Sequence, residues 1–95
     1  MLIEFTARHF HAPENVRSYA EKEVQRIKII FDRITHCQII LLHEKNQFTT
    51  ELNVSLPSHN LNVKETTDNM TKSVDKAVDK MITRVKKVKQ KMIAH

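Results

Sequence analysis

The chain has 95 residues, of which 40% are hydrophobic and 28% charged, a composition that suits one globular domain over residues 1–95. Its formal net charge of +5 favours a polyanionic partner, nucleic acid first and an acidic membrane surface second. The complete absence of glycine excludes glycine-rich phosphate loops and dinucleotide fingerprints, and no apolar run is long enough to span a membrane.

The first part of the chain predicts a strand and then a helix. Ile3, Phe5 and Ala7 alternate with polar residues, which is the period of a half-buried strand. Pro13 suits the first position of a helix, with Ala12 before it as a weak N-cap. The helix would extend for about five turns, because apolar residues recur every three or four positions at Val16, Ala20, Val24, Ile27 and Phe31.

The remainder predicts three strands and a second helix. Residues 36–45 and 48–56 both alternate in hydrophobicity, and a short polar turn joins them. A second turn at residues 57–60 leads to a shorter strand that carries Leu61 and Val63 on one face and Asn62, Lys64 and Thr66 on the other. Asp68 is expected to cap the last helix. The apolar residues of that helix share roughly 80 degrees of arc, namely Met70, Val74, Val78, Met81, Val85, Val88 and Met92.

These elements predict an α+β fold in the order β-α-β-β-β-α. Short turns make the last three strands an antiparallel meander, and the first helix crosses over to return strand one to the same sheet. Each helix has one apolar stripe, so both helices should cover one face of a four-stranded sheet, as in double-stranded-RNA-binding domains. Ile40 and Leu42 fall on the opposite, wet face, either as scattered surface residues or as a small partner-contact patch.

Cations gather on one side of the last helix. Lys72 and the five residues Lys76, Lys80, Arg84, Lys87 and Lys91 share an arc of roughly 120 degrees, whereas Asp75 and Asp79 lie outside it, and no acid follows Asp79. Like charges at this spacing cost roughly 0.2 to 0.5 kcal/mol per pair. The arc therefore indicates either an anionic partner or a solvated helix end whose lysines complement the dipole.

The first helix adds further cations, which two helices packed on one sheet could join with those of the last helix into a basic cleft. Lysine and arginine there would neutralise phosphates without reading bases, and the scarcity of aromatic residues makes base stacking improbable. The candidate RNA-binding residues are Arg17, Lys22, Arg26, Lys28, Arg33, Lys76, Lys80, Arg84, Lys87 and Lys91.

Other chemistry is weakly supported. His9 and His11 alternate but lack further metal ligands, so we expect no metal and no cofactor. Cys37 would need a paired histidine to act as a nucleophile, yet His36 lies on the opposite sheet face, which favours core filling. We therefore expect no enzyme. The single cysteine and the lack of a signal-peptide pattern lead us to expect a cytoplasmic protein.

Several segments together resemble a known family. The most specific is Phe31-Asp32-Arg33-Ile34, which closes the first helix. Others, in register along the whole chain, are Ile3, Phe5-Thr6, Arg17, Glu44-Lys45, Asn69-Met70, Asp75, Asp79-Lys80-Met81, Lys87, Lys89 and Lys91. With these residues the chain resembles the short-form ribosome hibernation promoting factors, of the ribosome-associated inhibitor and sigma-54 modulation protein family.

The chain also departs from the family pattern. Asn69-Met70-Thr71 stands where the family has aspartate, methionine and tyrosine, and Ser58-His59-Asn60 replaces hairpin glycines. The family's last-helix arginine falls on Thr83. Two first-helix lysines of relatives correspond to Glu23 and Arg26, so one cation is reversed and one is retained.

The resemblance implies a function without catalysis. It implies binding to the small ribosomal subunit and its ribosomal RNA, in the channel for messenger and transfer RNA, which would repress translation in stationary phase. Because the chain stops at His95, a C-terminal dimerisation domain and an acidic tail are both expected to be absent. The resemblance then implies support of 70S ribosome dimers with a separate ribosome modulation factor, by a free protein that is monomeric. The alternatives are a generic double-stranded-RNA module and a protein-interaction regulator of transcription.

Overall fold

Six elements follow one another in the predicted order β-α-β-β-β-α, in a computed structural model that describes residues 1–93. The four strands and two helices are β1 (Leu2–Arg8), α1 (Glu14–Ile30), β2 (His36–Glu44), β3 (Gln47–Leu56), β4 (His59–Thr67) and α2 (Met70–Ile93). None of the helices in this described part combines the length and apolarity needed to cross a bilayer.

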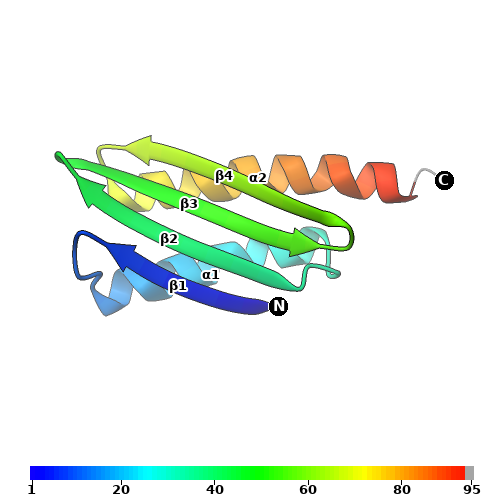
Figure 1. Ribbon diagram of the computed structural model, residues 1–95, viewed down its shortest axis with the longest axis horizontal. Coiled ribbons are helices and arrows are strands. Elements are labelled where there is room, and N and C mark those ends of the chain that lie inside the picture. Colours follow the sequence, from blue (N-terminus) through cyan, green and yellow to red (C-terminus); the bar gives the residue numbers. More distant parts are fainter. Residues whose placement is uncertain (94–95) are drawn as a thin grey trace.

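The strands form one sheet in the order β1-β2-β3-β4. β1 pairs in parallel with β2, with Ile3 opposite Cys37, because α1 carries the chain back before β2 begins. β2, β3 and β4 form the predicted antiparallel meander, in which Leu52 lies opposite Val63. Figure 1 shows both helices on the same side of the sheet, so the predicted two-layer arrangement is confirmed.

The core lies between the sheet and the two helices. β2 contributes Cys37, Ile39 and Leu41, all fully buried, and they pack with the apolar stripes of both helices. The stripes include Ala20, Val24 and Ile27 in α1 and Val74, Val78, Met81 and Val85 in α2. Burial raises the pKa of the Cys37 thiol to about 12, so the thiol stays protonated at neutral pH and fills space in the core.

Both helix starts lie one residue beyond the predicted positions. Pro13 is the N-cap of α1, not its first helical residue, and it offers no side-chain hydrogen bond. Asn69, not Asp68, caps α2, since its Oδ1 accepts the backbone N–H of Lys72 at 3.0 Å. A capping side chain must stand immediately before the helix for its oxygen to reach the backbone N–H of the third helical residue. Because α2 begins at Met70, Asp68 lies one residue too far away.

β4 is longer than the predicted short strand. It begins at His59 and spans nine residues, because the preceding turn uses only Pro57 and Ser58. Ser58 adopts a left-handed backbone with φ 62°, as do Lys45 and Asn46 in the hairpin between β2 and β3. Tight two-residue turns of this kind favour glycine or asparagine, and Ser58 takes the left-handed position here.

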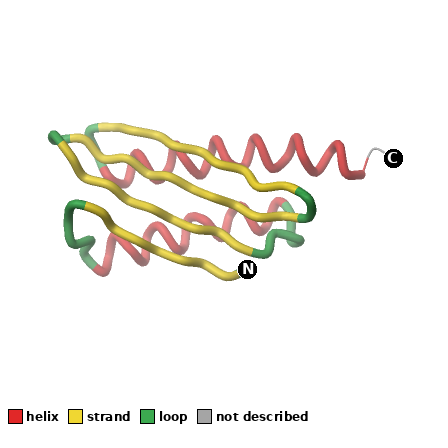
Figure 2. Tube along the Cα trace, in the orientation of Figure 1, coloured by secondary structure: helices red, strands yellow, loops and turns green. Residues whose placement is uncertain are grey.

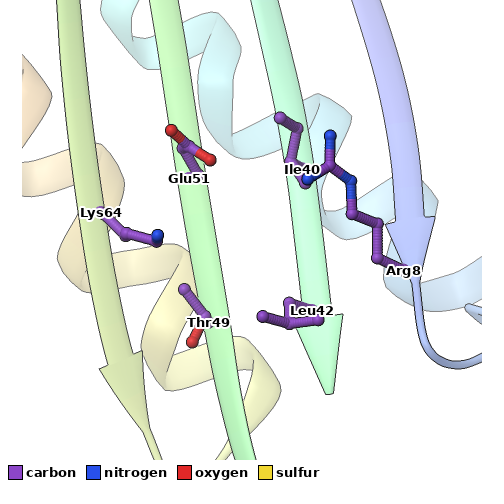
Figure 3. Close-up of a pocket in the computed structure, with 6 residues that line it drawn as sticks. All are labelled: Arg8, Ile40, Leu42, Thr49, Glu51 and Lys64. Atoms are coloured by element: carbon purple, nitrogen blue, oxygen red, sulfur yellow. The ribbon is translucent and has the colours of Figure 1, made fainter. Parts of the chain in front are cut away.

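The sheet face opposite the helices is open, and Figure 3 shows part of it. Ile40 is only 8% exposed, although it lies on this face, and Leu42 is half-buried. They line a hollow of about 50 Å³ together with Arg8, Thr49, Glu51 and Lys64. In Figure 3 the Arg8 side chain reaches from β1 towards Ile40, and long polar side chains of this kind cover apolar neighbours. Neither residue therefore forms a freely exposed patch.

Candidate nucleic-acid interface

The two acids of α2 face α1. Tyr19 of α1 donates a hydrogen bond to Asp75, and Arg26 donates to Asp79 at 3.1 Å and to Glu23 at 3.0 Å. These contacts use the side of α2 that lies outside the cation arc. They hold the helices side by side, and they leave the outward face of α2 without a carboxylate of its own.

The outward face of α2 carries exposed lysines. Lys76, Lys87 and Lys91 are exposed, and none of them forms an ion pair within residues 1–93. At 1.5 Å per residue, Lys76 and Lys87 lie roughly 16 Å apart along the helix and almost on one line. Lys86 is exposed too but falls between Asp75 and Asp79 around the helix, whereas Lys72 is exposed on the same face as Lys76, Lys87 and Lys91, although neither Lys72 nor Lys86 was among the candidates. This lysine row presents positive charge to solvent along most of the helix.

Two other candidates on α2 contact the outer strand of the sheet. The Nζ of Lys80 lies 3.4 Å from a carboxylate oxygen of Glu65, and Arg84 donates a hydrogen bond to the backbone oxygen of Asn62. Exposed pairs of this kind contribute only about 0 to 1 kcal/mol. Lys80 and Arg84 are thus held against β4, and only Lys80 has its charge partly neutralised.

The cations of α1 are more dispersed. Arg17 lies 3.4 Å from Glu21 and 5.5 Å from the ring centre of Phe5, while Lys22 is exposed. Lys28 is half-buried beside the amino group of Met1, and their proximity lowers the pKa of that amino group. The contacts of Glu23, Asp75 and Asp79 place negative charge between the two helices. The cations of α1 and those of α2 therefore do not join into one basic cleft.

A second basic surface lies where the two helices end. Arg33, from the connection after α1, and Lys91, near the end of α2, line a hollow of about 360 Å³. His59, Pro57, Ser58 and Met92 complete its lining. His59 was not among the candidates, because only the tertiary structure brings the turn before β4 against the end of α2. The sequence offered one signal that could have found it, because His59 belongs to Ser58-His59-Asn60, which stands where the family has hairpin glycines.

The remaining histidines do not assemble a metal site. No group of three or more His, Cys, Asp or Glu side chains that suits a metal ion occurs in residues 1–93. The Nδ1 of His9 lies 3.8 Å from a carboxylate oxygen of Glu44, and His43 stacks on Phe48 at 4.1 Å between ring centres. His36 lies on the open face, 3.4 Å from Glu4, whereas Cys37 points into the core.

The hydrogen bond from Tyr19 to Asp75 yields a prediction about pH. Donation to Asp75 raises the pKa of Tyr19 to about 12, since a neighbouring carboxylate disfavours the phenolate. Because the pKa of Tyr19 is higher in the folded protein than its unfolded value of about 10, the hydrogen bond contributes its full stability below about pH 10. This contribution disappears as pH rises through about 12. We expect Tyr19→Phe to lower the free energy of unfolding by about 0.5 to 1.5 kcal/mol at neutral pH, a difference that shrinks in strong base.

The chain has one tyrosine and no tryptophan, so the ultraviolet absorbance of tyrosinate reports Tyr19 alone. Urea unfolding at neutral and alkaline pH measures the stability difference. Asp75→Asn is the matched control, and it should return the titration of Tyr19 towards the ordinary value of about 10. If tyrosinate forms at that ordinary value in the unmodified protein, the contact between the helices is not made in solution.

Comparisons with known proteins identify relatives of this chain. The sequence profile of the family described as "Sigma 54 modulation protein / S30EA ribosomal protein" matches residues 3–93. A ribosome hibernation promoting factor of Pseudomonas putida is 26% identical over 91 residues, which cover 96% of this chain and 89% of that protein. Another from Acidithiobacillus ferridurans is 27% identical over 62 residues, which cover 62% of this chain and 80% of that one.

Two solved structures have the same fold. A ribosomal subunit interface protein from Coxiella burnetii superposes with a TM-score of 0.88 at 30% identity, covering 94% of this chain and 98% of that one. The N-terminal domain of Protein Y from Thermus thermophilus superposes with a TM-score of 0.85 at 26% identity, covering 93% and 99% respectively. The similarity therefore includes every element from β1 to α2.

Proposed function

Because the chain belongs to the sigma 54 modulation protein / S30EA ribosomal protein family, we propose that it binds the small ribosomal subunit through the outward face of α2 and represses translation. The observation that carries the proposal is the lysine row of Lys72, Lys76, Lys87 and Lys91, whose helix turns its acids towards α1. The relatives named ribosome hibernation promoting factor and ribosomal subunit interface protein support the ribosome as the partner.

The proposed mechanism is occlusion, without any bond being broken. The lysines neutralise phosphates of ribosomal RNA and release counterions, which supplies affinity without base readout. The apolar stripe of α2 packs into the core on the sheet, so the domain acts as a rigid wedge in the channel for messenger and transfer RNA. We propose that this silences 70S ribosomes in stationary phase and supports their dimers together with a separate ribosome modulation factor.

The proposal places the protein in the cytoplasm, with the ribosome, and as a monomer when free. The alternative of a protein-interaction regulator of transcription would rely on an apolar contact at Ile40 and Leu42. Ile40 is only 8% exposed and Leu42 is half-buried, which offers little apolar area to a partner. The alternative of a generic RNA-binding module predicts binding to any structured RNA. The sedimentation experiment below distinguishes that module from a ribosome-binding protein.

Sedimentation with purified ribosomal particles tests the proposal. We expect the protein to sediment with small subunits and 70S ribosomes at low salt, and not with large subunits or a naked RNA duplex. If about four to six phosphates are neutralised, the logarithm of affinity should fall against the logarithm of salt with a slope of roughly −3 to −5. Equal binding to large subunits and duplex RNA would indicate a generic RNA module, and no binding to any particle would refute the ribosome as partner.

A further inference from the structure

Three basic side chains from distant parts of the sequence line the hollow at the end of the molecule. Arg33 follows α1, His59 begins β4, and Lys91 lies near the end of α2. Figure 1 shows the α1–β2 connection and the β3–β4 turn at the same end, with the last turns of α2 extending past them. Figure 2 shows how short these connections are, so the elements bring the three residues together.

The surroundings of the hollow are well anchored. Lys89 donates a hydrogen bond of 2.9 Å to the backbone oxygen of Ile30 and lies 6.0 Å from the ring centre of the buried Phe31. This contact joins the end of α2 to the end of α1 and satisfies a helix-terminal carbonyl. Met92, which lines the hollow, packs against the core. The backbone around the hollow is therefore held in place even without a ligand.

The hydrogen bond of His59 determines what its ring presents. Nδ1 lies 3.0 Å from the backbone oxygen of Pro57, and a carbonyl oxygen can only accept, so Nδ1 carries the hydrogen. In the neutral ring Nε2 then has a lone pair, which repels an anion. In the protonated ring Nε2–H becomes a donor and the side chain gains a positive charge.

We propose that this hollow binds a phosphate group, and that it does so more tightly when His59 is protonated. The Arg33 guanidinium suits two phosphate oxygens at once, Lys91 adds a point charge, and His59 adds a third donor at low pH. The charged groups that line the hollow with His59 are Arg33 and Lys91, and no carboxylate lines it within residues 1–93. Asp32 is exposed but lies outside the lining.

The source of the phosphate is a backbone phosphodiester of ribosomal RNA, an assignment that rests on the proposed function. Binding would then strengthen as pH falls and the His59 ring takes up a proton. A phosphodiester keeps its single negative charge over this range, so a change in affinity has to come from the protein.

Proton and nitrogen NMR of the His59 ring and the Arg33 side chain tests the site directly. The probes are a dinucleoside monophosphate, which carries one phosphodiester, and inorganic phosphate, with sodium chloride at equal ionic strength as the blank. We expect both resonances to move with the phosphodiester, with roughly three- to tenfold tighter binding at about pH 6 than at about pH 8. Shifts that chloride reproduces equally would overturn the site. Shifts with inorganic phosphate alone would keep the site and overturn the backbone assignment.

Two histidine variants isolate the switch. His59→Gln should weaken binding at low pH and remove the pH dependence, whereas His11→Gln, remote from the hollow, should change neither. Arg33→Gln should weaken binding at both pH values. Circular dichroism confirms that each variant is folded. A pH dependence that persists in His59→Gln would show that another group is responsible and would refute the role of His59.

Sedimentation with small subunits separates this inference from the proposed function. If the unmodified protein binds small subunits more tightly at low pH and His59→Gln does not, both stand. If the unmodified protein binds small subunits with no dependence on pH or His59, the proposed function stands and the backbone assignment fails. If the protein fails to bind ribosomes while the NMR response to phosphate remains, the proposed function fails and the phosphate site stands.

Discussion

Reversing the charge of two lysines on the outward face of α2, Lys76→Glu together with Lys87→Glu, is expected to abolish sedimentation with small subunits at physiological salt. Both side chains are exposed, and neither has an ion-pair partner among the described residues, so the change removes no contact that holds the fold. Each reversal should cost about 1 to 2 kcal/mol against a phosphate surface. Affinity should fall by roughly 30- to 1,000-fold in total.

These two positions suit the test better than Lys80 and Arg84. Glutamate at position 80 would repel Glu65, and a change at position 84 would remove the hydrogen bond to the Asn62 backbone, so a loss of binding there would be ambiguous. Reversal at Lys76 and Lys87 should leave thermal unfolding nearly unchanged, because exposed substitutions usually stay within about 0.5 kcal/mol.

The control carries the same change in net charge elsewhere. Arg8→Glu with Lys45→Glu alters the end of β1 and the β2–β3 turn, which lie outside the proposed interface. We expect this control to bind small subunits with at most a modest loss from its lower net charge. If both double variants lose affinity equally, the overall charge carries binding. If the Lys76 and Lys87 variant still sediments normally, the lysine row is only a solvated helix face.

A neighbouring pair of isoleucines in α1 should differ sharply in its effect on stability. Ile27 is fully buried in the core, whereas Ile29 is 81% exposed. Ile27→Ala should lower the free energy of unfolding by about 2 to 5 kcal/mol, because it leaves a cavity between the helix and the sheet. A domain of this size is stable by only about 5 to 15 kcal/mol, so the loss is a large fraction of the total.

Ile29→Ala is the matched control, with the same chemical change two residues away. It should alter stability by no more than about 0.5 kcal/mol, since alanine favours a helix slightly more than isoleucine does. Urea unfolding followed by circular dichroism measures both variants, and the midpoint of Ile27→Ala should fall without a change in the slope. Equal effects in the two variants would mean that α1 does not pack on the sheet through the stripe containing Ile27.

Much of the architecture follows from local patterns that the sequence displays directly. The alternation in β1 and the three- and four-residue spacing in both helices determine which faces are apolar, and burial of those faces requires a two-layer arrangement. The element order, the antiparallel meander and the buried position of Cys37 were all predicted on this basis. The helix starts and the tight turn before β4 were not predicted correctly. The N-cap hydrogen bond of Asn69 and the left-handed backbone of Ser58 depend on the geometry at single residues, which hydrophobic periodicity does not specify.

The sequence by itself determined that cations occupy one arc of the last helix, because helical periodicity alone places residues around an axis. Only the tertiary structure decided which of those cations are unpaired. Lys80 is paired with Glu65, whereas Lys76 and Lys87 face solvent, and Arg26 of the first helix is engaged by Glu23 and Asp79. It likewise decided that Arg33, His59 and Lys91 share one hollow. Such pairings join residues far apart in the chain, and their partners depend on how the helices and strands pack, which no local pattern records.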